Sequence, residues 1–292
     1  MTWKRVATAV VLIPVVIALV LWGSTTVVAV AVAVLTAIAL WEYFALGEAI
    51  GHRAYRVWTI IGALLVIFFQ LLDVFNRLYI GNSGVTIVSV GSHNLAEMPS
   101  LGWAIFFFVT GLAVLTLFTR RPLVESLPAA GISSSAILLV AFPLSYAVRL
   151  HGFPRQGPEL LLFACGITWA GDTLAYFVGR AFGKHPLAPE LSPKKTWEGS
   201  VGSMVGSLVV AYAFSYWIKI PFGHLLAMGA VGNVAGQMGD LLESAYKRSA
   251  GVKDSGGLLP GHGGILDRID ALILCIPAIW YYLVLVNPRV LR

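Results

Sequence analysis

Nine long apolar runs constrain the fold of this 292-residue chain more than any other feature. A helix needs about 20 mostly apolar residues to cross the hydrocarbon core of a membrane. Only 12% of the residues are charged, about half the share found in soluble domains. The runs cover residues 6–22, 25–46, 57–72, 103–118, 131–148, 160–178, 200–218, 221–239 and 267–286. We therefore predict an all-α, polytopic integral membrane protein with about nine transmembrane helices.

The distribution of Lys and Arg predicts the orientation of these spans. With a cytoplasmic N-terminus and nine spans, fourteen of the 20 basic residues fall on the inner side, as the positive-inside rule requires. The first run follows Lys4 and Arg5 and resembles a secretory signal peptide, but a second run begins almost at once. We expect a retained helix, and the net charge of +6 then reflects orientation and gives no reason to expect a nucleic-acid partner.

The two halves of the chain differ in polarity. Residues 1–159 are apolar runs with short loops, apart from a loop at 73–101, and we expect them to support the fold. Their acids Glu42, Glu48 and Asp73 stand at span ends, where solvation at the membrane interface is the expected role. Cys165 and Cys275 lie inside apolar runs and suggest neither a disulfide nor a zinc site. Residues 160–292 are predicted to form the catalytic region.

Four polar stretches gather at the inner ends of the last four spans. They are GDTLAYFVGRAFGK (171–184), LSPKKTWEGS (191–200), GQMGDLLESAYKRSAGVKD (236–254) and KDSGGLLPGHGGILDRID (253–270). Gly202 and Gly206, four residues apart in span seven, also predict close helix packing.

Paired acids in these stretches indicate a cation site. Asp267 and Asp270 are three residues apart at the start of the last span, and Asp240 and Glu243 have the same spacing in the preceding one. Residues at this spacing share a helix face. Carboxylates from two helix ends suit Mg²⁺, with substrate phosphates completing its shell. The alternative is that Asp267 and Asp270 only stabilise the positive end of a helix dipole.

Asp172 lies within an apolar span, where a carboxylate is costly unless it is paired or hydrated. It is either functional or a structural partner of a neighbouring helix.

Bases and glycines among the acids indicate phosphate binding. Lys247, Arg248 and Lys253 lie between the two acid pairs, and Lys194 and Lys195 follow Ser192-Pro193 in another of the polar stretches. Glycines such as Gly263 and Gly264 permit unusual dihedrals, and amides in such a loop favour anions. His262 either donates to a phosphate or caps the loop. GRAFGK is no P-loop, because it has three residues between its glycines where four are needed.

The stretch from Ser244 to Asp270, SAYKRSAGVKDSGGLLPGHGGILDRID, resembles the signature of the phosphatidate cytidylyltransferases, or CDP-diacylglycerol synthases. GDTLAYFVGRAFGK, SPKKTWEG and KRVATAVVLIPVV are also similar to that family.

The resemblance implies an enzyme of the prokaryotic inner membrane that joins CTP to phosphatidate, with its active site facing the cytoplasm. It also implies Mg²⁺, K⁺ as a second cation, and a homodimer that residues 1–159 would support. The implied catalytic residues are Asp240, Asp267, Lys253 and Asp254, and the metal ligands are Asp240, Asp267 and Asp270. The implied substrate-binding residues are Arg180, Lys194, Lys195, Ser244, Lys247, Arg248, His262, Gly263, Gly264 and Arg268, with Asp172 as a further polar residue.

Two other functions compete with this interpretation. Another CTP-using lipid enzyme, such as a CDP-archaeol synthase or a polyprenol kinase, would keep the metal and phosphate chemistry and change the lipid. A transporter or channel would explain an intramembrane acid. Transporters usually place their sites at the membrane midplane between related repeats, whereas these polar stretches lie at one face and no repeat is visible.

Overall fold

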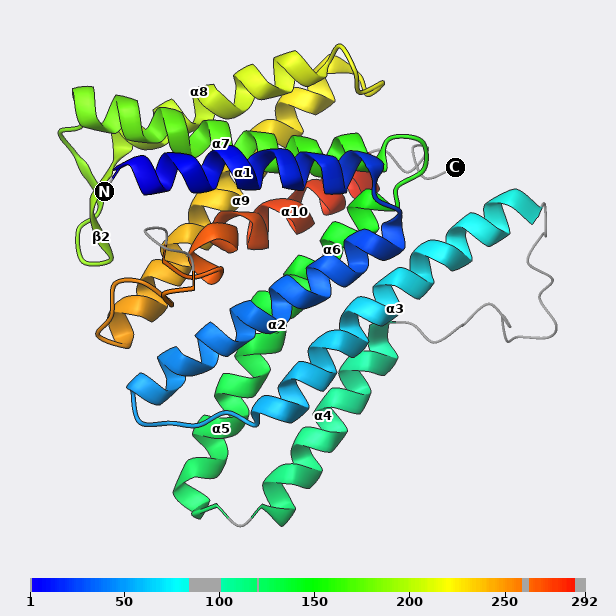
Figure 1. Ribbon diagram of the computed structural model, residues 1–292, viewed down its shortest axis with the longest axis vertical. Helices are drawn as coiled ribbons and strands as arrows, with labels where there is room; N and C mark the ends of the chain where they lie inside the picture. The colour runs from blue at the N-terminus through cyan, green and yellow to red at the C-terminus, as the bar shows by residue number, and fades with distance from the viewer. Residues whose placement is uncertain (1, 84–100, 120, 259–262, 287–292) are drawn as a thin grey trace.

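The computed structural model describes residues 2–83, 101–119, 121–258 and 263–286, which form a helical protein with one small hairpin (Figure 1). The first helices are α1 (Thr2–Trp22), α2 (Thr25–Ala49), α3 (Arg56–Ser83), α4 (Leu101–Phe118) and α5 (Leu123–Ala136). A π-helical segment, η1 (Ile137–Ala141), joins α5 to α6 (Phe142–His151), and α7 (Gly157–Phe182) follows. Strands β1 (Pro186–Ala188) and β2 (Ser192–Thr196) precede α8 (Trp197–Phe214), α9 (Phe222–Ser249) and α10 (Leu266–Val286). The hairpin is the one correction to the predicted all-α class among the described residues.

Six helical segments of the described chain are long and apolar enough to span a membrane, which supports a polytopic membrane protein. They are α2, residues 56–76 of α3, α4, the continuous rod Leu123–His151, α7 and α10. The described apolar part of α1, Val10–Trp22, is shorter, and α8 and α9 are richer in Gly and polar residues. The predicted number of nine spans is therefore not confirmed. Only 17% of α4 is buried within the protein, so most of its apolar surface is left for lipid.

The rod from α5 to α6 changes its hydrogen bonding at η1 because a proline interrupts the helix. Pro143 has no N–H to donate to the carbonyl four residues earlier. The amide of Phe142 donates instead to the carbonyl of Ile137, five residues earlier. This π-type turn keeps the helix continuous through the interruption.

Close packing and buried hydrogen bonds connect α7, α8 and α9. The predicted tight approach at Gly202 and Gly206 is confirmed, because a Cβ atom there would collide with Val178 and with the carbonyl of Ala170 on α7. The amide Nδ2 of Asn233 on α9 donates to Ser203 Oγ and to Ser207 Oγ on α8, both at 2.8 Å. Such bonds satisfy polar groups that water does not reach.

The β1–β2 hairpin is antiparallel and is anchored to the start of α8. Thr196 caps α8 by accepting a bond from the Gly199 amide at 3.1 Å. Glu198 accepts bonds from the amides of Lys184 and His185, and its Oε1 lies 2.6 Å from His185 Nδ1. Bonds from its own backbone amide and from His185 lower the pKa of Glu198 to about 2. An ionised carboxylate thus fixes both ends of the segment that carries Lys194 and Lys195.

Helix α10 joins two apolar cores. Its first half contributes Leu266, Ile269 and Ile273 to a core shared with α2 to α6. Its second half, including Ile279 and Leu283, packs in a core with α1, α6, α7 and α9. Figure 1 shows α10 and α9 lying between the α7–α8 layer and the α2–α5 group. The start of α10 is therefore held by helices from both halves of the chain.

Candidate active site

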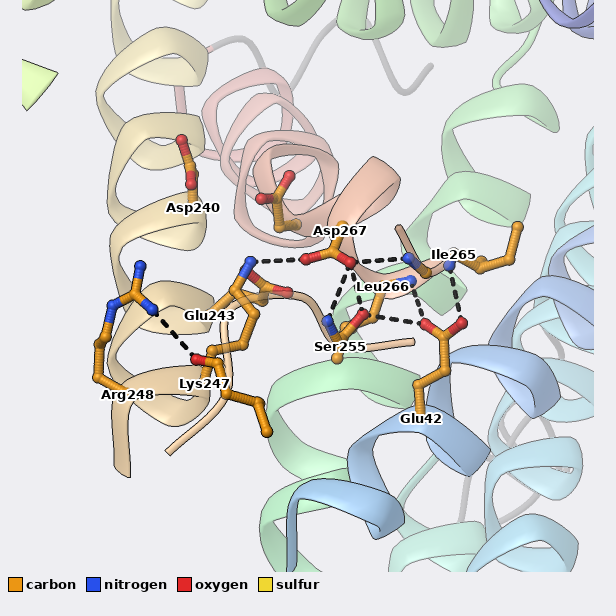
Figure 2. A network of polar contacts seen from close by, with 12 residues as sticks. Glu42, Asp240, Glu243, Lys247, Arg248, Ser255, Ile265, Leu266 and Asp267 are labelled. Carbon is orange, nitrogen blue, oxygen red and sulfur yellow. Dashed lines mark hydrogen bonds and ion pairs between the residues drawn. The ribbon is translucent and has the colours of Figure 1, made fainter. Parts of the chain in front are cut away.

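The four polar stretches that were predicted to gather do meet in space. Lys195 of β2 forms an ion pair with Asp240 of α9, with Nζ to Oδ2 at 2.5 Å. Arg248 Nε donates to the carbonyl of Leu191 in the hairpin turn at 3.1 Å. Lys247 Nζ lies 2.6 Å from Asp267 Oδ1. The hairpin, the end of α9 and the start of α10 thus form one charged region, part of which is drawn in Figure 2.

Asp267 is the most heavily hydrogen-bonded of the predicted acids. Its Oδ2 accepts the amide of Gly264 at 2.8 Å and the amide of Ser255 at 3.0 Å, and it lies 3.0 Å from Ser255 Oγ. Its Oδ1 is paired with Lys247. Figure 2 shows the Asp267 carboxylate between Lys247 and Ser255. The carboxylate is therefore fixed in position by groups on both sides of it.

Two glycines allow this arrangement. Gly263 has a φ of +79°, a conformation that L residues rarely adopt. A Cβ atom on Gly263 would stand 2.6 Å from Asp267 Oδ2. The amide of Gly264, which was expected to favour an anionic ligand, donates to the Asp267 carboxylate of the protein itself. His262, the neighbour that was expected to bind phosphate or cap the loop, lies outside the described residues.

Lys247 lies between two buried acids. Its Nζ contacts Glu243, four residues earlier on α9, as well as Asp267. Burial raises the pKa of the Glu243 carboxyl to about 8, even though Lys247 acts in the opposite direction. Burial alone would lower the pKa of Lys247, but its hydrogen bonds to Asp267 and Glu243 outweigh that effect, so its pKa is raised. Lys247 is thus held as the counterion of this acid pair.

A second group of acids lies beside the first. Asp270 interacts electrostatically with Asp240, Glu243 and Asp172, and Asp172 also interacts with Lys195 and Arg268. Helices α9 and α10 approach closely here, because a Cβ on Gly239 would collide with the carbonyl of Asp270. Although Asp267 and Asp270 share the first turn of α10, they have different partners.

A cavity of about 310 Å³ opens next to these acids. Asp172, Lys194, Lys195, Ser200, Gln237 and Asp240 are among its lining residues. The Nζ of Lys195 is buried and, among the described residues, its only polar contact is the ion pair to Asp240. Its other N–H groups are thus available to an anionic oxygen in the cavity. The cavity therefore combines acids, lysines and amide groups that suit a phosphorylated ligand.

The remaining predicted residues lie on the elements around this region. Arg180 donates to the hydroxyl of Tyr176 at 3.0 Å on the exposed side of α7. Ser244 is buried on α9. Lys253 and Asp254 are exposed on the loop before α10, and Arg268 is exposed on α10. The structure thus gathers the acids and Lys195 and Lys247 more tightly than these residues.

Glu42 is the site residue that the sequence interpretation missed. We expected it to be solvated at the membrane interface, but it is 7% exposed. Its carboxylate accepts the amides of Ile265 at 3.0 Å and Leu266 at 2.8 Å. It lies in α2, more than 200 residues from its partners, so no local pattern could have indicated the contact. Asp73 is also paired, with Arg149 at 2.6 Å.

The residues present suit a magnesium ion in their donor type. Mg²⁺ is commonly held by one or two carboxylates together with substrate phosphates. In the described part of the chain, no three His, Cys, Asp or Glu side chains gather closely enough to hold a metal ion by themselves. The carboxylates of Asp240 on α9 and Asp270 on α10 nevertheless lie close enough to interact electrostatically. A cation held by these carboxylates would therefore need substrate oxygens to complete its shell.

Comparison with known proteins agrees with this chemistry. The chain is 40% identical to the phosphatidate cytidylyltransferase of Bacillus subtilis over 178 residues, which are 59% of this chain and 66% of that protein. It is 45% identical to that of Haemophilus influenzae over 140 residues, 44% of this chain and 47% of that protein. The chain thus spans about half to two thirds of the length of these relatives. Residues 3–286 match the model of the cytidylyltransferase family, and the chain therefore belongs to that family.

Proposed function

We propose that this protein is a CTP:phosphatidate cytidylyltransferase, which makes CDP-diacylglycerol and pyrophosphate. The observation that carries the proposal is the convergence of acids from α9 and α10 with Lys195 and Lys247 beside a polar cavity. The names of the bacterial relatives support the choice of substrates.

The reaction needs positioning and charge neutralisation more than proton transfer. An ionised phosphate oxygen of phosphatidate attacks the α-phosphorus of CTP and forms a new P–O bond. The bond between the α-phosphorus and the bridging oxygen breaks, and pyrophosphate leaves with the electron pair. Because the nucleophile is already ionised, no strong general base is required. The work left for the protein is to align the two phosphates and to offset their charge.

Side chains of this chain are suitably placed for that work. Lys194 and Lys195 line the cavity and would bind nucleotide phosphates, and Lys247 stands close enough to Asp267 to contact phosphates beside it. Arg180, Arg248, Lys253 and Arg268 would add positive charge at its edge. Asp240, Asp270 and Asp267 would hold Mg²⁺, with K⁺ as a second cation. Bound magnesium would neutralise charge on the nucleotide and on the leaving group.

The finer features of location and assembly are part of the same proposal. We propose nine membrane spans, with α1, α8 and α9 crossing in addition to the six apolar helices. The protein would lie in the inner membrane with its N-terminus and active site at the cytoplasm, where CTP is available. It would act as a homodimer, with the lipid chains of phosphatidate remaining in the bilayer.

Turnover by purified protein tests the proposal directly. With Mg²⁺, labelled CTP and phosphatidate in detergent micelles, the wild type should release pyrophosphate. Asp240→Asn and Asp267→Asn should each lower turnover by at least about a hundredfold, because each removes a charge from the cation site. Glu48→Gln is the matched control, since Glu48 pairs with Arg53 and Arg56 away from this region.

Two results would contradict the proposal. Either Asn variant retaining a rate near wild type while folded would refute the role of its carboxylate. Faster turnover with archaetidic acid or a polyprenyl acceptor than with phosphatidate would refute the lipid assignment and favour a related CTP-using enzyme.

A further inference from the structure

Helix α10 begins without a cap from its own sequence. Leu266 is its first residue, and Ile265, which precedes it, has no side-chain oxygen to accept an amide bond. The first amides of a helix have no partner within that helix and need an external acceptor when they are buried. Glu42 of α2 supplies it, because Oε1 accepts from the Ile265 amide at 3.0 Å and Oε2 from the Leu266 amide at 2.8 Å. Its negative charge also suits the positive end of the helix dipole.

Ser255 connects Glu42 to Asp267. Its hydroxyl oxygen lies 3.1 Å from Glu42 Oε2 and 3.0 Å from Asp267 Oδ2 (Figure 2). A serine hydroxyl has one hydrogen to donate, so the two carboxylates share a single donor. The Ser255 amide remains on Asp267 at 3.0 Å. The buried side chain of Ser255 therefore links the carboxylate of Glu42 to the carboxylate of Asp267.

Two glycines of the surrounding loop lie directly against the Glu42 carboxylate. A Cβ atom on Gly256 would stand 2.6 Å from Glu42 Oε1, and one on Gly264 would collide with Glu42 Oε2. Glu42 is 7% exposed and Ser255 is 6% exposed, so water does not replace these bonds readily. A buried carboxylate is tolerated where it is fully hydrogen-bonded. Two glycines of the loop thus accommodate an acid from a helix in the other half of the chain.

We propose that Glu42 is a positioning residue for Asp267, holding the start of α10 and Ser255 so that the Asp267 carboxylate keeps its orientation. This role rests on the proposed function, in which Asp267 contributes to the cation site. Hydrogen-bonded partners of metal-binding carboxylates typically matter by about 10- to 100-fold in activity. Glu42 would therefore act on the rate of reaction with little effect on substrate affinity.

The test compares Glu42→Gln with Ser255→Ala, their double variant, and Glu48→Gln as a control on the same helix. Glu42→Gln keeps the size of the side chain and removes its charge and one acceptor oxygen. It should lower kcat by about 10- to 100-fold while KM for CTP and for phosphatidate stays within about threefold. The double variant should lose less than the product of the two single losses, because both act through the same hydroxyl.

Hydrogen exchange gives a readout that does not depend on turnover. Glu42→Gln should speed exchange of the amides of Ile265 and Leu266 several-fold, and Glu48→Gln should not. A wild-type kcat in folded Glu42→Gln, or single losses that multiply fully in the double variant, would overturn the positioning role. If Glu42→Gln does not fold, Ser255→Ala alone decides, and an unchanged kcat in it refutes the proposal.

The two proposals fail in different ways. Absence of cytidylyl transfer by the wild type would refute the proposed function, and the positioning role would be refuted with it. Turnover by the wild type together with loss in Asp267→Asn but not in Glu42→Gln would leave the proposed function intact and refute the positioning role alone.

Discussion

Lys247 shows at the scale of single residues how this site depends on charge balance. Its side chain is 11% exposed and lies between Glu243, which is 4% exposed, and Asp267, which is 6% exposed. Removing one partner of a buried ion pair costs more than the pair itself contributes, because the remaining charge is left without compensation. The lysine is therefore expected to stabilise the fold in addition to any contact with substrate.

Replacement of Lys247 by Ala should sharply destabilise the protein. Loss of the cation leaves the buried Asp267 carboxylate without its counterion, and breaking a buried pair costs about 3–5 kcal/mol. The unfolding temperature in detergent should fall clearly, and adding Asp267→Asn to the variant should recover part of the loss because it removes the uncompensated charge. Arg248→Ala is the neighbouring control, since Arg248 is exposed and should have a smaller effect. An unfolding temperature equal to wild type would show that Lys247 is not the required counterion.

Most of the charged residues of this site could be predicted from the sequence, but their partners could not. Asp240, Asp267, Lys195 and Lys247 stand in short polar stretches that contrast with the apolar runs around them. Glu42 was assigned to the membrane interface because it stands at the end of a predicted span. Its burial depends on a contact across more than 200 residues, and local patterns carry no information about such contacts.

At the scale of elements, the hairpin and α8 act as one unit. The long apolar runs predicted helices, whereas the hairpin has only eight strand residues and lies in a polar stretch for which no strand was predicted. Its position depends on Glu198, which joins the residues before β1 to the first turn of α8. The lysines expected to bind phosphate are therefore placed by a carboxylate that the sequence interpretation did not single out.

Glu198→Gln should loosen the hairpin without unfolding the helices. The glutamine accepts weaker bonds from the amides of Lys184 and His185, so hydrogen exchange of residues 184–196 should become faster at pH 7. A folded pKa of about 2, below the ordinary value of 4.5, means that the ionised form stabilises the hairpin above about pH 4.5. That contribution is lost as the pH falls toward 2.

The pH dependence of hydrogen exchange distinguishes loss of the bonds to Glu198 from a general loss of structure. In the wild type, exchange corrected for its intrinsic rate should stay constant between pH 7 and pH 5. Glu190→Gln, in the hairpin turn, serves as the control. Equal protection in Glu198→Gln and wild type would show that this carboxylate does not hold the hairpin.

At the scale of the whole molecule, α10 connects the two halves that composition distinguishes. Its first half shares an apolar core with residues of α2 to α6, and its second half shares another with residues of α1, α6, α7 and α9. The N-terminal half therefore contributes to the site directly, through Glu42, as well as through packing. Composition distinguishes the halves by polarity, but it could not show that the helix carrying Asp267 and Asp270 contributes to both cores.

The proposed topology requires α8 and α9 to cross the membrane, although both are richer in Gly and polar residues than the six apolar segments. Their orientation therefore tests the topology. If both cross the membrane, the connection between them lies outside and the end of α9 lies inside. Lys219→Cys and Ser249→Cys place single thiols at these two positions, which are both exposed. The native Cys165 and Cys275 are buried, so unmodified protein should give little background.

In bacterial spheroplasts, a membrane-impermeant maleimide should label Lys219→Cys at once and Ser249→Cys only after permeabilisation. Labelling of both from the same side would mean that α9 does not cross, and labelling in the opposite order would place the acids of α9 and α10 away from cytoplasmic CTP.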